Sequence, residues 1–149
     1  MKFYIILATA IFILDQVVKN IVRSDILIGE TIPLINGVFH ITHVVNSGAA
    51  FGVLGNATWL LIILSILIIG GVIYIIESRK FDCIWQRLGL AFTLGGALGN
   101  LMDRIVFRQV TDFLDFRLIN FPVFNIADIF IVVGAIILII TIIFARKPE

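Results

Sequence analysis

Charged residues are scarce in this chain. Only 14% of its 149 residues are Asp, Glu, Lys or Arg, whereas 60% are hydrophobic and the mean hydropathy is +1.14. Soluble domains carry about 25% charged residues, so this composition excludes an ordinary soluble fold. The 11 basic and 10 acidic residues nearly cancel, which leaves no excess of positive charge for nucleic acid. We expect an integral membrane protein without a nucleic-acid partner.

Cysteine and histidine, which form disulfides and bind metals, are also rare. Cys83 is the single cysteine, so the chain has no internal disulfide, and we interpret Cys83 as an incidental thiol in a loop. The two histidines, His40 and His43, are three residues apart, but no third ligand with the usual spacing accompanies them. We therefore expect no metal and no other cofactor.

Long apolar runs account for most of the chain. Each is close to the ~20 residues that cross a hydrocarbon core of ~30 Å. The four runs are residues 3–22, 57–76, 88–106 and 124–145. Little length remains for a soluble domain, so we expect one membrane domain over residues 1–149. The first run ends in Asp15, Lys19 and Arg23 without a small-residue cleavage site, and is expected to be a retained span.

The segment 23–56 between the first two spans has the pattern of a small sheet. Residues 38–45 partly alternate, as in a half-exposed strand. One side would carry Phe39, Ile41, His43 and Val45, and the other His40 and Thr42. The predicted fold class is therefore a membrane all-α bundle of four helices, with a small β-sheet or loop outside the membrane.

Basic residues indicate the orientation. Positive charge concentrates in the loop between the second and third spans and in the C-terminal tail, which is typical of the cytoplasmic side. These residues are Arg79, Lys80, Arg87, Arg146 and Lys147. The long loop 23–56 instead carries Asp25 and Glu30. We expect both termini in the cytoplasm and any chemistry near the outer face.

Carboxylates mark the candidate site. An Asp at the centre of a membrane helix costs about 2.5–3.5 kcal/mol on insertion scales, so such a residue needs a function. Asp15, Asp103, Asp112 and Asp128 come from three distant stretches, yet a rise of ~1.5 Å per residue brings all of them near the outer boundary. Asp112 would lie in the short segment joining the last two spans. We interpret Asp112 and Asp128 as a catalytic pair.

Polar neighbours accompany these acids at helical spacing. Asn100 and Asp103 share one helix face, as do Asn125 and Asp128, so each amide could orient its own acid or a bound peptide. Arg104 could neutralise a carboxylate near the boundary, or extend its charge to the headgroups. Local pairing of Asp15 with Lys19, one helical turn away, is also possible.

Two other classes of protein remain to be weighed. A proton or ion carrier also places carboxylates in membrane helices, but its acids should be spread across the membrane depth. A non-catalytic assembly partner would explain the Gly95 and Gly99 pair, which allows close helix approach, but not the paired acids. The assembly partner predicts that acid substitutions are harmless.

The motifs together resemble those of bacterial lipoprotein signal peptidase, also called signal peptidase II. The resemblance covers nearly the whole chain and rests on five blocks in the family's order. These are Asp15 with Lys19, residues 46–51 (NSGAAF), 95–104 (GGALGNLMDR), 110–113 (VTDF) and 124–128 (FNIAD). The chain departs from the family's pattern at Ser47, Thr111 and Ile129, and the Thr111 hydroxyl could tune Asp112.

This resemblance implies an aspartyl endopeptidase that cuts prolipoproteins just before a diacylglyceryl-modified cysteine. It implies Asp112 and Asp128 as catalytic residues, sharing one proton around a water molecule. Which of the two holds that proton is left open. The positions implied to bind substrate or support the site are Asp15, Lys19, Asn46, Gly48, Asn100, Asp103, Arg104, Asn125 and Ala127.

The resemblance further implies a bacterial inner membrane and a substrate helix that enters sideways from the bilayer. The expected partners are lipid-modified prolipoprotein signal peptides and membrane lipids, and nothing in the sequence requires more than a monomer. A loop carrying Phe39, Phe51 and Trp59 is expected to cover the substrate.

Overall fold

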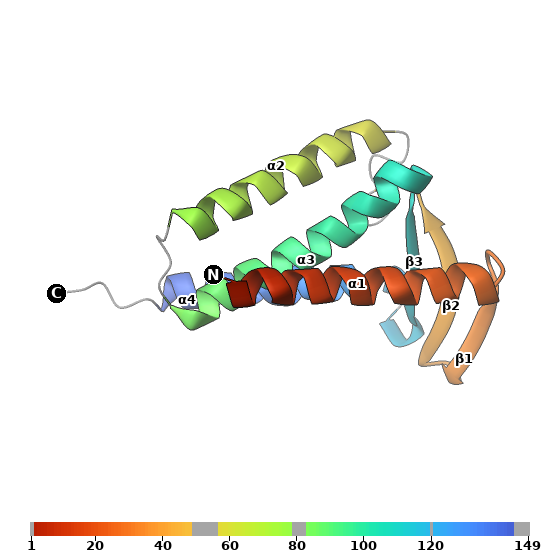
Figure 1. Ribbon diagram of the computed structural model, residues 1–149. Coiled ribbons are helices and arrows are strands. Elements are labelled where there is room, and N and C mark those ends of the chain that lie inside the picture. The colour runs from red at the N-terminus through yellow and green to blue at the C-terminus, as the bar shows by residue number, and fades with distance from the viewer. Residues whose placement is uncertain (1, 49–56, 79–82, 120, 145–149) are drawn as a thin grey trace.

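Four helices and a three-stranded sheet make up the computed structural model, which describes residues 2–48, 57–78, 83–119 and 121–144. The helices are α1 (Lys2–Asp25), α2 (Thr58–Glu77), α3 (Ile84–Phe107) and α4 (Ile126–Ile143). The strands are β1 (Thr31–Ile35), β2 (Phe39–Asn46) and β3 (Val110–Phe116), followed by the short helix η2 (Arg117–Ile119). The sheet lies at the end of the bundle opposite the start of α1 (Figure 1).

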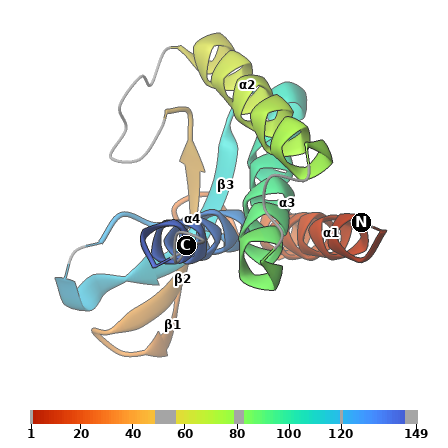
Figure 2. The ribbon, with the colours of Figure 1, turned by 90° about the vertical axis from the view of Figure 1, so that its left-hand side faces the viewer.

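Helix α3 is the centre of the bundle. Seen along the helix axes, α1 and α4 flank it and α2 lies on a third side (Figure 2). Glycines on α3 make this arrangement possible. A Cβ on Gly95 would lie 2.7 Å from the Ala8 carbonyl oxygen of α1, and one on Gly96 would overlap the Ala127 carbonyl oxygen of α4. The small residues therefore let two neighbouring backbones approach α3 on adjacent faces.

All four helices are long and apolar enough to cross a membrane. Large side chains cover their outer surfaces, and Ile6, Leu67 and Ile139 are each more than half exposed. In water such a surface would be unstable, so these faces are suited to lipid. The predicted fold class, four membrane helices with a small sheet, is confirmed.

The ends of α1 and α4 differ from the predicted spans because polar residues extend α1 and cap α4. Helix α1 continues three residues past the expected end and includes Arg23 and Asp25. Helix α4 begins at Ile126, two residues later than expected, because Asn125 is its N-cap. The Asn125 side chain accepts from the Asp128 N–H, and the Asp128 carboxylate accepts from the Asn125 N–H, which forms a capping box.

The sheet has the order β1-β2-β3, and both pairs are antiparallel. The sequence pattern indicates the β2 region but not β3. Strand β3 lies in the segment that is expected only to join the last two spans. Strand β3 follows α3 after a turn in which Arg108 adopts a left-handed conformation, with φ of 62°. Asp112 therefore lies in a strand, whose backbone is held by hydrogen bonds.

The predicted alternation of β2 fails at His43. A register shift between Ile41 and Val44 interrupts the pairing of β2 with β3, so Thr42 and His43 are both buried. A His43 ring nitrogen lies 2.7 Å from the Ile26 carbonyl oxygen. The bulge thereby ties the middle of the sheet to the chain just after α1.

Candidate active site

Asp112 projects from β3 between two amide groups. Asn46 at the end of β2 donates from Nδ2 to Asp112 Oδ2 at 2.9 Å. Asn125 donates from Nδ2 to Asp112 Oδ1 at 2.7 Å. The Asp112 side chain is 2% exposed, so each carboxylate oxygen meets a donor in a region that holds little water.

Asp128 approaches from the first turn of α4. Asn100 of α3 donates from Nδ2 to Asp128 Oδ1 at 2.7 Å, and the Asn125 backbone N–H donates to Oδ2 at 3.2 Å. Asn125 thus contacts both carboxylates, one through its side chain and the other through its backbone. The single residue before α4 therefore links the two acids.

Asn125 contacts its own acid, Asp128, as the spacing suggested, but Asn100 does not contact Asp103 in this way. The sequence left two roles for the Asn100 amide, orienting Asp103 or a bound peptide, whereas the structure shows it donating to Asp128 of α4. The side-chain oxygen of Asn100, Oδ1, accepts from Lys19 Nζ at 3.0 Å and from Asn125 Nδ2 at 3.1 Å. Because two donors hold the oxygen, the Asn100 NH2 group is directed at the acid.

Asp112 and Asp128 line one cavity of about 430 Å³. Its polar side also includes Asn46, Asn100 and Arg104. Its apolar side includes Val110 of β3 and consists otherwise of residues before α4 and along its first turns, namely Phe121, Pro122, Val123, Phe124, Ile129, Ile131, Val132 and Val133. Val132 is 56% exposed, so this wall continues into the lipid-facing surface of α4. An apolar segment in the bilayer could reach both carboxylates along it.

The pKa of Asp112 is raised to about 6. Burial is the main cause, because it disfavours the charged form, and the nearby Asp128 carboxylate raises the pKa further. Hydrogen bonds from Asn46 and Asn125 oppose this change, and so does the positive charge of Lys19. The Asp112 carboxyl therefore holds a proton at a higher pH than an exposed aspartate would.

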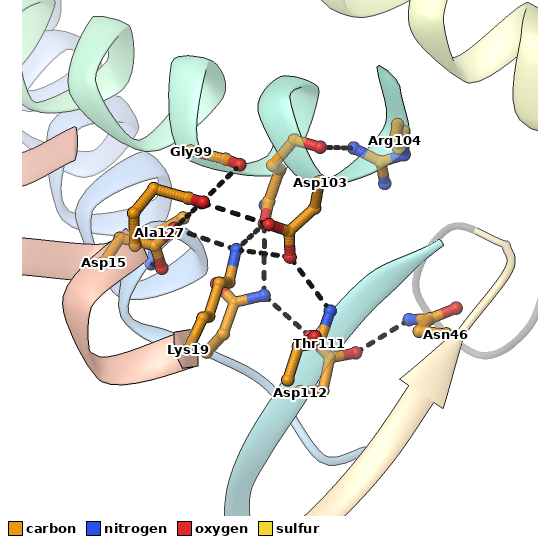
Figure 3. A network of polar contacts seen from close by, with 12 residues as sticks. Asp15, Lys19, Asn46, Gly99, Asp103, Arg104, Thr111, Asp112 and Ala127 are labelled. Atoms are coloured by element: carbon orange, nitrogen blue, oxygen red, sulfur yellow. Dashed lines mark hydrogen bonds and ion pairs between the residues drawn. The ribbon is translucent and has the colours of Figure 1, made fainter. Parts of the chain in front are cut away.

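A buried ion-pair network supports the site (Figure 3). Lys19 and its two partners, Asp15 and Asp103, are fully buried, with Lys19 Nζ 2.8 Å from Asp15 Oδ2 and 3.3 Å from Asp103 Oδ2. The expected local pair of Asp15 with Lys19 is therefore present. Asp15 Oδ1 also accepts from the Ala127 N–H at 2.9 Å, which attaches α1 to the first turn of α4. Removing one member would leave an unpaired buried charge.

Three other sequence-predicted residues lie around this network. Gly48 is buried, lines the cavity and donates from its backbone to Asn46 Oδ1 at 2.9 Å. Ala127 is fully buried against Gly96 and Gly99 of α3. Arg104 turns away from Asp103 toward the cavity, where its Nη1 lies 3.4 Å from the backbone carbonyl oxygen of Asn100 (Figure 3).

Sequence reasoning missed two polar residues of α1. Gln16 Nε2 donates to Asp103 Oδ1 at 3.1 Å and to the Gly99 carbonyl oxygen at 3.1 Å. Arg23 Nη2 lies 2.9 Å from the same Asp103 oxygen. Arg23 could have been found from its spacing, because it is one turn beyond Lys19 on the same face.

The loop that is expected to cover the substrate carries Phe39, Phe51 and Trp59. Phe51 lies outside the described residues. Phe39 starts β2, whereas Asn46 at the other end of that strand lines the cavity, so ~23 Å of strand separates Phe39 from the site. Trp59 is 63% exposed on α2 and is absent from the described cavity wall. The described cavity wall therefore includes neither Phe39 nor Trp59, and the covering role of this loop stays a prediction.

Within the described ranges, no three His, Cys, Asp or Glu side chains come together as a metal site. The features that are present define a class of protein. It is a multi-pass membrane protein in which two carboxylates, each hydrogen-bonded to at least one asparagine side chain, line one cavity at the end of the helices.

Comparison with known proteins identifies the family within this class. The sequence profile of signal peptidase II matches residues 7–144. A lipoprotein signal peptidase of Clostridioides difficile (strain 630) is 45% identical over 146 residues, covering 98% of both chains. One of Microcystis aeruginosa (strain NIES-843 / IAM M-2473) is 47% identical, covering 94% of this chain and 91% of that protein. The chain belongs to the signal peptidase II family.

Solved structures agree with this assignment. A bacterial membrane enzyme determined by the in meso method at 2.3 Å resolution superposes with a TM-score of 0.93. It is 30% identical, and the match covers 100% of this chain and 94% of that one. The four helices and the sheet therefore have the arrangement of a known bacterial membrane enzyme.

Proposed function

We propose that this protein is a membrane aspartyl endopeptidase that removes signal peptides from diacylglyceryl-modified prolipoproteins, cutting before the lipidated cysteine. The observation that carries the proposal is the shared cavity, in which Asp112 and Asp128 are linked through Asn125. Membership of the family supports the substrate class. The test is cleavage of a lipid-modified precursor by the purified protein. A folded wild-type protein that leaves the precursor uncut would contradict the proposal.

Amide hydrolysis at this site needs one ionised and one protonated carboxyl group. The ionised group takes a proton from a water molecule, which attacks the scissile carbonyl carbon, while the protonated partner donates to the carbonyl oxygen. Two nearby carboxylates repel each other, so a pair that shares one proton is the working state. Burial and the neighbouring Asp128 carboxylate raise the pKa of Asp112, which favours Asp112 as the group that holds the shared proton.

The pH dependence should report this proton. The protonated form of Asp112 is lost as the pH rises through its pKa, so kcat/KM should fall on the alkaline side. The Asn46 amide stabilises the ionised form, and its loss should raise the pKa. We therefore expect Asn46→Ala to move the alkaline limb of the kcat/KM profile to higher pH. Asn36→Ala, in the exposed β1–β2 turn, should leave it in place. A limb that stays or moves down in Asn46→Ala would contradict the assignment.

The substrate would approach through the bilayer. The apolar cavity wall runs from Phe121 to Val133 and joins the lipid-facing surface of α4. A signal helix lying beside α4 would bring its outward end to the two carboxylates. One chain supplies both carboxylates and the amides that hold them, so the proposed reaction requires no second copy, and we propose action as a monomer among membrane lipids.

The proposed location is the inner membrane of a bacterium, with both termini in the cytoplasm and the sheet outside. The described ends of α1 and α4 that lie nearest the termini are at the same end of the bundle, opposite the sheet (Figure 1). The Arg and Lys residues around the α2–α3 connection favour the cytoplasm for that end.

The native Cys83 provides a direct test of this orientation. Cys83 is exposed just before α3, at the end of the bundle away from the sheet. A membrane-impermeant maleimide should label it only after intact cells are permeabilised. Ser24→Cys in a Cys83→Ser background should be labelled in intact cells, because Ser24 is exposed near the sheet. The reverse labelling pattern would invert the proposed topology.

A further inference from the structure

Strand β3 is an edge strand, and its free edge is held on both sides of Asp112. Just before Asp112, the Thr111 N–H donates to Asp103 Oδ2 at 3.1 Å. Just after it, the Phe113 N–H donates to the Phe124 carbonyl oxygen at 3.0 Å. An unpaired edge would leave these backbone groups without partners. The two contacts thus hold the strand where its carboxylate enters the cavity.

A side chain of α1, Arg23, contacts both partners of the Thr111–Asp103 hydrogen bond. Arg23 Nε donates to Thr111 Oγ1 at 3.0 Å, and Arg23 Nη2 donates to Asp103 Oδ1 at 2.9 Å. Its third nitrogen, Nη1, donates to Asn20 Oδ1 at 3.2 Å. The guanidinium carbon also lies 4.3 Å from the centre of the Phe107 ring. All three nitrogens and one face of the group are engaged, and the side chain is only 19% exposed.

This contact also revises an expectation from the sequence. The Thr111 hydroxyl was expected to tune Asp112 directly, but successive strand residues point to opposite faces. The hydroxyl faces α1 and Arg23, whereas the Asp112 carboxylate faces the cavity. Any influence of Thr111 on Asp112 therefore passes through the position of the backbone.

We propose that Arg23 and Thr111 are positioning residues for Asp112. Arg23 of α1 joins Asp103 of α3 to Thr111 at the start of β3, and we call these three residues the clasp. The inference rests on the proposed function, because it assigns the clasp a part in that reaction. The described contacts of the Arg23 side chain are Asn20, Asp103, Phe107 and Thr111, and none of these residues lines the described cavity.

Removal of the clasp should therefore lower kcat more than it changes KM. Thr111→Val keeps the shape and the backbone N–H but removes the acceptor. We expect kcat to fall about three- to tenfold, the value of one hydrogen bond, with KM within about twofold. Thr111→Ser keeps the hydroxyl and should retain at least about half of the wild-type kcat. Arg23→Met should lower kcat about tenfold or more, while Lys19 still pairs with Asp103.

The double variant separates positioning from general stability. If Arg23 and Thr111 act as one clasp, Arg23→Met with Thr111→Val should be no slower than Arg23→Met alone. Arg117→Met is the matched control, because it removes a 2.8 Å ion pair with Asp115 on the same strand, away from the clasp. We expect this control to stay within about twofold of wild type.

Each outcome decides the proposal. Unchanged kcat in Thr111→Val and Arg23→Met would overturn it while the proposed function stands, and so would multiplicative losses in the double variant. Losses that only follow a lowered Tm, with Thr111→Ser as slow as Thr111→Val, would reduce the clasp to a structural role and overturn it too. If Arg23→Met does not fold, Thr111→Val against Thr111→Ser decides. A folded wild-type protein without cleavage would overturn the function and this inference together.

Discussion

Replacing either Asp112 or Asp128 by Asn should abolish cleavage of a lipid-modified precursor while the protein remains folded. Asn has nearly the same size as Asp, but it neither ionises nor supplies a carboxyl proton. A positioned acid or base contributes about 10²- to 10⁴-fold, so loss of one partner should bring turnover below detection in a gel-shift assay. Addition of a metal chelator should leave the wild-type activity unchanged, because the proposed chemistry requires only the two carboxyl groups.

The same strand provides the control for this experiment. Asp115 also lies in β3, three residues after Asp112, but it pairs with Thr42 and Arg117 at the sheet and does not line the described cavity wall. Asp115→Asn should therefore cleave within about twofold of wild type, as expected for a change at an ion pair away from the reaction. Turnover retained by purified Asp112→Asn or Asp128→Asn would remove that residue from the mechanism. Inhibition of the wild type by the chelator would contradict a metal-free dyad.

Much of the fold could be predicted because lipid imposes simple rules. Spanning helices need about 20 apolar residues, so their number and approximate positions follow from composition. Their ends could not be derived in this way, because Arg23 and Asp25 are polar yet helical. At α4, Asn125 delays the start of the helix by two residues through a capping box that depends on atomic geometry.

The sheet was only half predictable. Residues 38–45 alternate enough to indicate β2, but residues 110–116 form a strand because β2 is available to pair with them. Such pairing depends on tertiary structure more than on local pattern. The bulge that buries His43 likewise depends on its contact with Ile26, seventeen residues earlier.

The candidate site was predictable in its membership and not in its connections. Membrane carboxylates stand out in a sequence because they are costly, which is why Asp15, Asp103 and Asp128 were all found. Spacing on one helix suggested that each amide serves its own acid. The structure shows that Asn100 serves Asp128 of another helix, because the close packing of α3 on α4 brings them together.

That close packing makes Gly96 a sensitive position, and Gly96→Ala should damage both stability and catalysis. The added methyl group would overlap the Ala127 carbonyl oxygen and lie 2.8 Å from Ile131 Cγ1. Helix α4 would have to move away from α3 in the turn that carries Asp128. Overpacking costs about 1–3 kcal/mol, so the Tm should fall. A displacement of about 1 Å at a reacting group can lower kcat by up to about a hundredfold, so we expect a loss of about ten- to hundredfold.

Two other glycines test whether the location of the added methyl group decides the result. A Cβ on Gly71 of α2 meets nothing within 4 Å, so Gly71→Ala should leave both Tm and kcat at wild-type values. Gly89 lies in the same α3–α4 contact, where an added Cβ would be 2.9 Å from the Gly134 carbonyl oxygen, but it is seven residues or ~10 Å along the helix from Gly96. Gly89→Ala should therefore lower the Tm with a much smaller loss of kcat. Equal kcat losses in Gly89→Ala and Gly96→Ala would show that catalysis responds to bundle stability in general. A wild-type kcat in folded Gly96→Ala would contradict the claim that the close packing of α4 on α3 holds Asp128 in its catalytic position.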